Sequence, residues 1–456
     1  MRRAVGVGLV SVVGLLPSGS VAQAPPRAER AAELVRLALD EGRAFAILSD
    51  LTRVAPKRLS GSPGAAAAVA WAQETMRELG LERVREQEVT VPRWVRGDVE
   101  TLELVGVDDA APLPILALGG SVGTSSAGVE AELIVVRGFE QLRELGDRAR
   151  GKMVLFNRPM PRALLSTFRA YGQAVPQRTN GAVEAAKVGA VAALVRSMTT
   201  RIDDVPHTGA VRYADAVPPV PAAAVSTAAA DALAARLKSG ETVRLRLRLA
   251  CETLPETPSA NVLGEIRGTE RPEEIVLVGA HLDSWDVGQG AHDDGAGCAH
   301  VLEAMRLIKA AGGAPKRTIR AVLFMNEENG LRGARAYAIA CRDELGQHVA
   351  AIETDAGGFE PKGFNTSADE TRREVLRAAL EPLREYGMGA LIPGGGGADI
   401  SVLKPHGVPL FGLAVTSHRY FDVHHSARDT IDQVHERELA LGAAAVAYLA
   451  WSLADE

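Results

Sequence analysis

The sequence is poor in the residues that mark disulfide-bonded, nucleic-acid-binding or membrane-spanning proteins. Its 456 residues include only three cysteines, Cys251, Cys298 and Cys341, an odd number that forms no disulfide framework. A bridge between Cys251 and Cys341 stays open, whereas Cys298 is predicted to be a small buried apolar residue. The formal net charge of -6 argues against a nucleic-acid partner. Aromatic residues make up only 4% of the chain, and no stretch after the N-terminal region is long enough to be expected to span a membrane.

The N-terminus has the pattern of an export signal. Arg2 and Arg3 precede a short, mostly apolar run over residues 4–16, and small residues follow it. Cleavage between Ala22 and Gln23 predicts a signal peptide at residues 1–22. The mature chain is then expected in the periplasm or outside the cell. Its hydrophobic content of 46% and charged content of 24% are ordinary for a soluble globular protein of two or three domains.

Hydrophobic periodicity divides the mature chain into three segments. The first segment has two helical patterns and a strand pattern at 84–95, where Pro92 restricts that strand to a sheet edge or a bulge. A small, polar stretch at 120–128 opens a self-contained α/β segment, which ends near Pro255 and Pro258. The helical patterns of the first segment cover 30–48 and 65–79. The α/β segment is predicted to have strands at 133–136, 151–156, 190–195, 220–225 and 243–249, and helices at 139–150 and 181–188.

Strands and helices alternate after residue 260. Strands are predicted at 275–278, 319–325, 349–352 and 409–415, and helices at 296–310, 369–386 and 436–453. This alternation favours an α/β fold with a mostly parallel sheet covered by helices on both faces. In such sheets the functional groups collect at the carboxyl ends of the strands.

Histidine and carboxylate side chains follow these strand ends. His281 comes after the strand at 275–278, Glu327 and Glu328 follow 319–325, and Asp355 follows 349–352. Two further groups complete the set, one at Asp293 and one at His424-His425. A structural zinc site would be rich in cysteine, whereas histidine and carboxylate ligands leave a water molecule in place. The pattern therefore indicates a metallohydrolase.

Five side chains are the predicted metal ligands: His281, Asp293, Glu328, Asp355 and His425. With Asp293 shared, each of two Zn²⁺ ions has three protein ligands. One ion takes His281 and Asp355, and the other takes Glu328 and His425. Three carboxylates against four positive charges leave +1, which favours a metal-bound hydroxide as nucleophile.

Two carboxylates beside the ligands are predicted to assist. Glu327 is the candidate general base, since it adjoins a ligand and would move a proton from the metal-bridging water to the leaving amine. Asp283 lies two residues past His281, where its carboxylate would accept the ring N–H of that histidine. Each fragment alone has a plainer interpretation: a strand end, a solvated Glu-Glu turn, a surface loop, or a helix cap at Asp293. Their joint occurrence in a βα-alternating segment favours the metal site.

The run from Gly279 to Gly295, GAHLDSWDVGQGAHDDG, resembles the carboxypeptidase Q family, also called plasma glutamate carboxypeptidase. That family belongs to the co-catalytic dinuclear zinc peptidases and has an inserted protease-associated domain. The resemblance covers the chain from about residue 30 to the C-terminus. It also includes the runs at 151–157, 181–190, 206–209, 353–357 and 424–426.

The resemblance implies a secreted homodimeric exopeptidase that hydrolyses dipeptides with free termini. It assigns residues 27–119 and 256–456 to the two parts of the catalytic domain and 120–255 to the protease-associated domain. It also carries the metal-ligand roles to the five residues named above, with Glu327 as the base and Asp283 as the supporting residue. The implied partners are peptide or dipeptide substrates, with no nucleic acid and no membrane span.

Some positions depart from the family pattern. Related enzymes place a tyrosine near the last histidine ligand as oxyanion donor, and here His424 or Tyr420 is the candidate instead. His292 adjoins Asp293, where it would either tune that carboxylate or face outward. In the glycine-rich loop at 393–397, the backbone could approach a ligand closely. Asp399 then either pairs with a substrate ammonium group or caps the next helix.

Two other functions compete with a dipeptidase. One is an aminopeptidase acting on longer peptides, since the loops that would close the pocket are not evident in the sequence. The other is a non-catalytic binding protein on the same fold. Such relatives lose metal ligands or the base, whereas this chain has all five ligands and Glu327.

Overall fold

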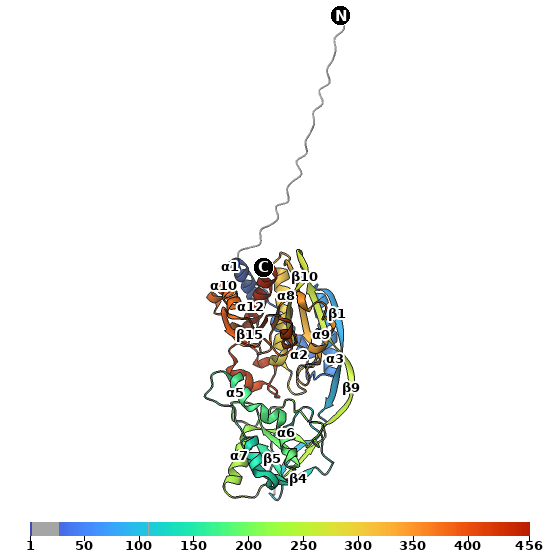
Figure 1. The fold of residues 1–456 in the computed structure, drawn as a ribbon, viewed down its shortest axis with the longest axis vertical. Coiled ribbons are helices and arrows are strands. Elements are labelled where there is room, and N and C mark those ends of the chain that lie inside the picture. Colours follow the sequence, from blue (N-terminus) through green and yellow to red (C-terminus); the bar gives the residue numbers. More distant parts are fainter. Residues whose placement is uncertain (2–26, 108) are drawn as a thin grey trace.

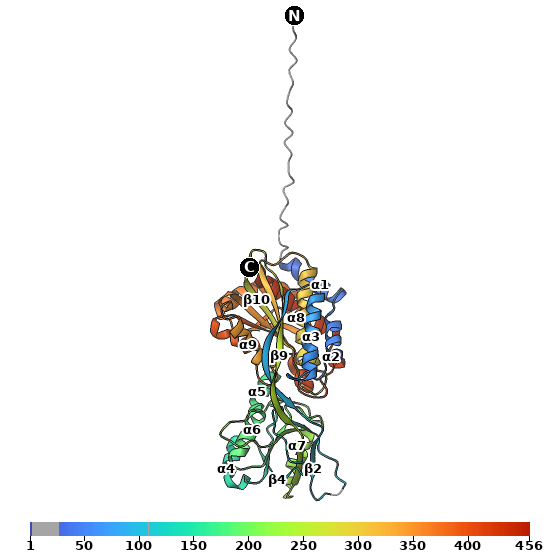
Figure 2. The same ribbon diagram turned by 90° about the vertical axis from the view of Figure 1, so that its right-hand side faces the viewer.

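Two bodies make up the computed structural model, which describes residues 27–107 and 109–456 together with Met1. Figures 1 and 2 show that the larger body carries both the first helices and the C-terminal helix, and that the smaller body carries α4 to α7. The long strands β1 (Glu82–Val95) and β9 (Glu252–Ile266) run side by side from one body to the other. Residues 2–22 of the expected signal peptide lie outside the described residues.

The larger body is built on an eight-stranded sheet in the order β1-β9-β11-β10-β12-β15-β13-β14. Its other strands are β10 (Arg271–His281), β11 (Arg317–Phe324), β12 (His348–Glu353), β13 (Pro361–Thr366), β14 (Ala390–Pro393) and β15 (Leu410–Val415). The four central strands, β11, β10, β12 and β15, run parallel. The strands β1 and β9 on one side and β13 on the other pair antiparallel. The sheet is therefore mixed, and the predicted parallel arrangement holds for its centre.

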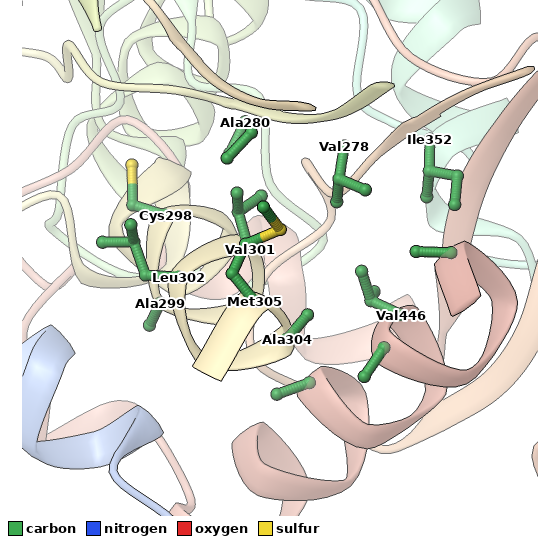
Figure 3. Close-up of a cluster of buried hydrophobic side chains, with 14 of the residues drawn as sticks. Val278, Ala280, Cys298, Ala299, Val301, Leu302, Ala304, Met305, Ile352 and Val446 are labelled. Carbon is green, nitrogen blue, oxygen red and sulfur yellow. The ribbon is translucent and has the colours of Figure 1, made fainter. Parts of the chain in front are cut away.

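Helices cover both faces of this sheet. They are α1 (Arg27–Asp40), α2 (Ala44–Val54), α3 (Pro63–Glu78), α8 (Ala296–Ala310), α9 (Arg332–Ala340), α10 (Glu370–Leu380) and α12 (Glu436–Asp455). The short helix α11 (Tyr420–Val423) instead packs Tyr420 and Phe421 into an apolar cluster of the smaller body. On one face, side chains of α8 such as Val301 and Met305 meet Val278 of β10, Ile352 of β12 and Val446 of α12 (Figure 3). On the other face, Tyr337 of α9 packs against the sheet. Helix α12 is long and apolar enough to span a membrane, but 89% of its most apolar window is buried inside the protein.

The smaller body has its own seven-stranded sheet, in the order β2-β8-β4-β5-β6-β7-β3. Its strands are β2 (Glu100–Leu104), β3 (Ile115–Ala117), β4 (Val129–Val136), β5 (Met153–Phe156), β6 (Ala192–Arg196), β7 (Ala222–Val225) and β8 (Arg244–Leu249). Its helices are α4 (Phe139–Leu145), α5 (Thr167–Ala174), α6 (Pro176–Lys187) and α7 (Thr227–Lys238). The central strands β4 to β7 are parallel, and two apolar clusters cover the sheet.

Strand pairing moves the predicted segment boundaries. Strands β2 and β3 lie before residue 119, yet they pair with β8 and β7 and therefore belong to the smaller body. Pro255 and Pro258 do not mark a break, because both lie inside β9. Strand β9 pairs with β11 only over Val262 to Ile266, so the prolines occur where one edge of β9 is open, and an open edge tolerates proline. Strand β1 is an edge strand with a register shift at Pro92, as predicted.

A salt bridge and a close packing contact join the bodies. The Arg96 guanidinium binds the Asp286 carboxylate at 2.6 Å and Glu100 at 2.9 Å. Gly119 lies against the Trp285 indole, and a Cβ there would lie 2.0 Å from the ring. Any larger residue at Gly119 would therefore push the bodies apart.

All three cysteines are buried and unpaired. Cys251 lies in the apolar cluster of the smaller body, whereas Cys341 lies at the end of α9 in the larger one. The bridge between them that the sequence left open is therefore not formed. Cys298 is fully buried in α8, as predicted.

The core also buries His300, whose pKa predicts loss of stability in acid. His300 lies where α8 meets α12, with Nδ1 2.8 Å from the Thr354 hydroxyl. Burial lowers the pKa of His300 to about 3, whereas an unfolded histidine titrates near 6.5. The unfolded chain thus binds more protons between these values, and each pH unit in this window removes about 1.4 kcal/mol of stability.

We expect His300→Gln to abolish this contribution. Urea unfolding of the metal-free protein gives its free energy of unfolding at pH 6.5 and at pH 5. The decrease in this free energy from pH 6.5 to pH 5 should be about 2 kcal/mol smaller in the variant than in the natural chain. His406→Gln, a change at an exposed position, is the matched control and should leave the difference unchanged. An equal acid loss in His300→Gln and the natural chain would contradict the assignment.

Candidate metal centre

The five predicted ligands meet at the carboxyl ends of the parallel strands. His281 is the last residue of β10, and Asp355 follows β12 by two residues. Glu328 lies in the loop after β11, while Asp293 precedes α8 and His425 follows α11. The three strands are neighbours in the sheet, so residues more than 70 positions apart come to one edge.

Asp293 lies between two imidazoles. Its Oδ1 is 3.2 Å from Nε2 of His281, and its Oδ2 is 3.2 Å from Nε2 of His425. Asp355 Oδ1 lies 3.7 Å from the same His281 nitrogen, and Glu328 Oε2 lies 3.1 Å from that of His425. This places one histidine and one terminal carboxylate on each side of a shared aspartate, in the pairing expected from the sequence.

Backbone hydrogen bonds to two further carboxylates hold Asp293 and His281 in position. Asp429 accepts from the backbone N–H groups of Asp293 at 3.1 Å and His292 at 2.7 Å. Asp294 accepts from the N–H of His281 at 3.2 Å and that of Gly297 at 3.0 Å. Both carboxylates are buried, so they act as fixed supports beneath the ligands.

Asp283 supports the site through different atoms from those predicted. The ring Nδ1 of His281 lies 3.0 Å from the backbone carbonyl of Asp283, but 3.9 Å from its carboxylate. The carboxylate instead accepts from the backbone N–H groups of Asn326 at 2.8 Å and Glu327 at 3.1 Å. Because Asp283 is only two residues past His281, its carbonyl reaches the ring first. The carbonyl fixes the His281 tautomer, and the carboxylate fixes the loop that carries Glu327.

The ionisable groups of the cluster are buried and perturb one another. Burial opposes charge on His425, but Glu328 and Asp293 more than offset it and raise the pKa of His425 to about 9. Burial raises the pKa of Glu328 to about 7, and the nearby Asp293 adds to this shift. Burial opposes charge on Asp293 as well, but the neighbouring imidazoles of His281 and His425 outweigh it, so the pKa of Asp293 lies well below its usual value. A cation entering the cluster would therefore displace protons from the histidines.

Unsatisfied polar atoms show that the cluster fits metal ions. His281 Nε2, Asp293 Oδ2 and Glu328 Oε1 are buried and have no hydrogen-bond partner among the described residues. Burying such atoms is energetically unfavourable unless a bound group interacts with them. Two triads of ligand atoms lie within 4.8 Å of one another, His281-Asp293-Asp355 and Asp293-His424-His425. The histidine and carboxylate donors fit Zn²⁺ ions that share Asp293.

His424 and Tyr420 lie beside this cluster, at the wall of the cavity that contains Glu327. The His424 ring stacks on that of His425 with centroids 3.5 Å apart, and its Nε2 is 3.6 Å from Asp293 Oδ2. Only His425 also meets Glu328, so we keep His425 as the ligand. The Tyr420 ring lies 5.0 Å from that of His424. Burial, followed by the neighbouring His425, holds the pKa of His424 well below its usual value, which leaves a neutral ring.

Asp399 is fully buried beneath Glu353. Its side chain makes no helix-capping hydrogen bond, so the capping alternative is wrong. Its backbone N–H donates to Glu353 Oε1 at 3.3 Å, and neither Asp399 oxygen has a partner among the described residues. Burial and the adjacent Glu353 raise the pKa of Asp399 well above its usual value. Glu353, unlike Asp399, lines a cavity and would meet a substrate ammonium group first.

His292 neither faces outward nor contacts the metal ligands through its ring. The ring is buried and stacks on Phe359 with centroids 4.1 Å apart. Its Nε2 is 3.1 Å from the Gln433 carbonyl, and its Nδ1 accepts from the Gly358 N–H at 3.1 Å. The residue thus holds two loops together behind Asp293.

Residues of the smaller body complete the site and have no local pattern that identifies them. The Thr208 N–H donates to the His425 carbonyl at 2.9 Å, and His207 Nδ1 lies 2.6 Å from the His424 carbonyl. Arg178 of α6 reaches the His425 ring. His207 and Thr208 fall within a run that carried the family resemblance, and this was the one available signal. No feature of the sequence identified Asp429 or Arg178 as part of the site.

Two adjoining cavities open onto the cluster. The first encloses about 590 Å³ and is lined by Asp293, Glu327, Glu328, both histidines of the last loop, and residues of the smaller body. The second encloses about 660 Å³ and is mostly apolar, with Glu353 and Asp355 at its inner end. Asp355 lines both cavities. A cluster of histidine and carboxylate side chains, with the further carboxylate of Glu327 in the same cleft, fits a metallohydrolase.

Comparisons with known proteins specify the family. Peptidase family M28 matches residues 261–450. Human carboxypeptidase Q is 36% identical over 415 residues, which cover 91% of this chain and 86% of that protein. A crystal structure of a peptidase M28 precursor from Shewanella amazonensis SB2B superposes with a TM-score of 0.90 at 35% identity, covering 94% of this chain and 97% of that one. The chain belongs to peptidase family M28 and is a zinc metallo-exopeptidase.

More distant structures share the fold. A zinc aminopeptidase from Bacillus subtilis superposes with a TM-score of 0.64 at 21% identity, covering 89% of this chain and 94% of that one. An identity this low supports the shared architecture alone.

The shared carboxylate predicts the metal content of ligand variants. Asp293→Ala should lose both ions, because one oxygen faces each side of the cluster. His281→Ala and His425→Ala should each retain about one ion at limiting metal, since each removes a ligand of one site only. Metal analysis after dialysis against trace zinc measures these contents. Two ions retained in Asp293→Ala would show that the aspartate is not shared.

Proposed function

We propose that the chain is an exported dinuclear zinc peptidase that hydrolyses dipeptides. The observation that carries the proposal is that Glu327 and four of the five candidate ligands line one cleft, while the fifth, His281, contacts Asp293 from behind it. The smaller body covers this cleft on the side of His425. A closed cleft of this size holds a short peptide. Human carboxypeptidase Q and its relatives from frog and mouse bear the name of a carboxypeptidase, which agrees with an exopeptidase of this kind.

Glu327 acts as the proton carrier. Bound zinc ions would supply a polarised peptide carbonyl and a water molecule of lowered pKa. Glu327 is half-buried and lines the cleft, and its pKa is raised well above the usual value by burial. Its carboxylate takes the proton of the attacking water and returns it to the nitrogen of the leaving amino acid. The Asp283 carboxylate holds the Glu327 backbone in place for both transfers.

His424 or Tyr420 donates to the oxyanion. Both side chains line the same cleft as Glu327, and the His424 ring is held against His425 by stacking. A neutral His424 keeps one N–H available as a donor. Preorganised donors of this kind contribute when negative charge develops on the carbonyl oxygen.

The second cavity receives the side chain of the N-terminal residue. Its wall is largely apolar, with Leu165, Ile392, Leu413 and Val415 among the lining residues. The glycine-rich loop at 393–397 forms another part of the wall. Glu353, at the inner end beside Asp355, pairs with the substrate ammonium group. This arrangement favours dipeptides whose first residue is apolar.

The remaining expectations from the family resemblance are part of the same proposal. The smaller body is a protease-associated domain, the enzyme is a homodimer, and it is exported to the periplasm or the medium after removal of residues 1–22.

Hydrolysis of a dipeptide and of a tripeptide, compared under the same conditions, distinguishes a dipeptidase from an aminopeptidase. A binding protein without activity is disfavoured, because the candidate ligands meet in two groups around Asp293 and Glu327 lines the same cleft as Asp293.

Glu327→Gln tests the proposed reaction. The variant should keep two zinc ions, since Glu327 is not a ligand, but lose dipeptide hydrolysis by about 10²- to 10⁴-fold in kcat. Metal analysis and initial rates on one dipeptide give both values. Glu374→Gln, a change at an exposed position of α10, should leave both unchanged. Full activity in metal-loaded Glu327→Gln would refute the role of this carboxylate.

The oxyanion donor is tested with His424→Ala and Tyr420→Phe. The variant that removes the donor should lower kcat by about 10²- to 10³-fold with little change in KM, because the contact forms only in the transition state. The other variant should retain its turnover. Unchanged turnover in both variants, each with two zinc ions, would dismiss both residues as donors.

A further inference from the structure

The second cavity is larger than the side chain of one amino acid requires. It encloses about 660 Å³ and reaches Asp355, which also lines the first cavity with Glu327. Pockets of roughly 300 to 1,000 Å³ hold small molecules of drug size. A branched or aromatic side chain next to the scissile bond would therefore leave part of the second cavity unfilled.

The two bodies share the apolar wall of this cavity, and the wall continues to the protein surface. Leu413 of β15 and Ile392 of β14 come from the larger body, whereas Leu165 and Phe168 come from the smaller one. Leu165 is 92% exposed, which makes it the most exposed large apolar side chain in the described range 27–456, and Ile392 and Phe168 are also exposed. Single exposed apolar side chains are ordinary, but three at the mouth of one apolar cavity extend its binding surface to solvent.

The polar side chains in the wall already have partners within the protein. Glu353 accepts hydrogen bonds from the backbone N–H groups of Asp399 at 3.3 Å and Ile400 at 2.8 Å. Four other side chains are paired in the same way: Ser166 with Arg169, Lys362 with Glu360, Thr416 with Glu360, and Ser417 with Thr167. Asn365 is paired with the glycine-rich loop. Apart from the candidate ligand Asp355 and the exposed His418, the described wall therefore offers a bound molecule no unpaired polar side chain.

An aliphatic chain fits this wall better than a peptide chain does. Each peptide residue brings an N–H and a C=O group, and burying these groups without partners is unfavourable. The glycine-rich loop does not supply them freely, because the Gly394 N–H already donates to the Thr366 carbonyl and the Gly396 N–H to Asn365. Methylene groups need no partner and gain free energy on leaving water. Glu353 keeps its two backbone donors, so it is not left unpaired by a substrate that has no ammonium group.

Contacts beside Leu165 hold the mouth of the cavity in place. The Thr167 hydroxyl donates to the Ser417 carbonyl of the larger body at 2.8 Å. Phe168 stacks on Tyr420 with ring centroids 5.2 Å apart. Helix α5, which begins at Thr167, lies on the side of the smaller body that faces the larger one (Figures 1 and 2). The mouth is therefore formed before a ligand binds, which reduces the entropy lost on binding.

We propose that the enzyme also hydrolyses N-acyl amino acids, with the aliphatic acyl chain in the second cavity and its end at Leu165. This inference rests on the proposed function, because the same centre and Glu327 carry out the reaction. The oxygen of water adds to the acyl carbonyl carbon, the C–N bond breaks, and Glu327 carries the proton of the water to the leaving nitrogen. The products are a carboxylic acid and a free amino acid, so the reaction needs no other reactant than water.

The test is a chain-length series on the natural, zinc-loaded enzyme. Butanoyl-, hexanoyl-, octanoyl- and decanoyl-alanine are each used below the concentration at which they form micelles. The kcat/KM should rise about twofold for each added CH2, and so about 60-fold from butanoyl to decanoyl, because each CH2 leaves water for the cavity. Tetraalanine, which has a peptide extension in place of the acyl chain, should have a kcat/KM at least about tenfold below that of decanoyl-alanine. A higher value for tetraalanine would show that the cavity holds a peptide chain and would overturn the proposal.

Leu165→Asn tests where the chain ends. The variant should lower kcat/KM about fivefold for decanoyl-alanine and less than about twofold for butanoyl-alanine, because only the longer chain reaches the mouth of the cavity. Ile339→Asn removes an exposed apolar side chain from α9, outside the cavity, and should keep both values. An equal loss for both chain lengths in Leu165→Asn would refute the placement of the chain.

The natural enzyme decides even if a variant fails to fold. Hydrolysis of leucylalanine without hydrolysis of any acyl-alanine, or a kcat/KM that does not rise with chain length, would refute the inference alone. Hydrolysis of neither class by the zinc-loaded enzyme would refute the proposed function as well. Decanoate should inhibit leucylalanine hydrolysis at concentrations at least about tenfold below those of butanoate, and equal inhibition would refute an aliphatic chain site.

Discussion

The shared carboxylate of Asp293 is the constraint on which the site depends. Its two oxygens lie 3.2 Å from two imidazole nitrogens, and each of these nitrogens also has a second carboxylate nearby, Asp355 at 3.7 Å or Glu328 at 3.1 Å. Buried groups of like charge repel strongly where water cannot screen them, so the cluster is stable as a set of ligands only with protons or cations between its members. The supports beneath it follow from this requirement. Asp429 and Asp294 fix the backbone of Asp293 and His281, and the Asp283 carbonyl leaves the metal-facing nitrogen of His281 free.

The central parallel strands bring the candidate ligands together with little irregular structure. Strands β10, β11 and β12 are neighbours, so the end of β10 and the turns after β11 and β12 bring His281, Glu328 and Asp355 to one edge without long loops. The cleft beside this edge is covered by a second element, the smaller body. The long paired strands β1 and β9 connect this body to the larger one (Figure 2). The larger body thus supplies the candidate ligands, and the smaller body contacts the loop that carries His424 and His425.

Features with a local cause were predictable from the sequence. Apolar strands that lead into His281 and into Glu327-Glu328 predicted both the sheet and its functional edge. Pro92 predicted an edge strand or a bulge, and β1 has both features. Features set by distant pairing were not. Strands β2 and β3 look like parts of the first segment until β8 and β7 pair with them more than 100 residues later. Which atom of Asp283 meets the His281 ring is likewise decided by the loop geometry. Arg178 has no neighbours in sequence that mark it, because only the fold brings α6 to the His425 ring.

The smaller body does more than cover the cleft, since it also holds the metal-ligand loop. The carbonyls of His424 and His425 bind His207 and the Thr208 N–H, so two residues of this body fix the loop that carries the last ligand. His207 is buried, and burial lowers its pKa to about 4, which keeps it neutral and able to donate one proton to a carbonyl. Displacement of this body would therefore loosen His425 as well as open the cleft. His207 and Thr208 thus tie the loop of His424 and His425 to the smaller body, whose strands lie between β1 and β9 in the sequence.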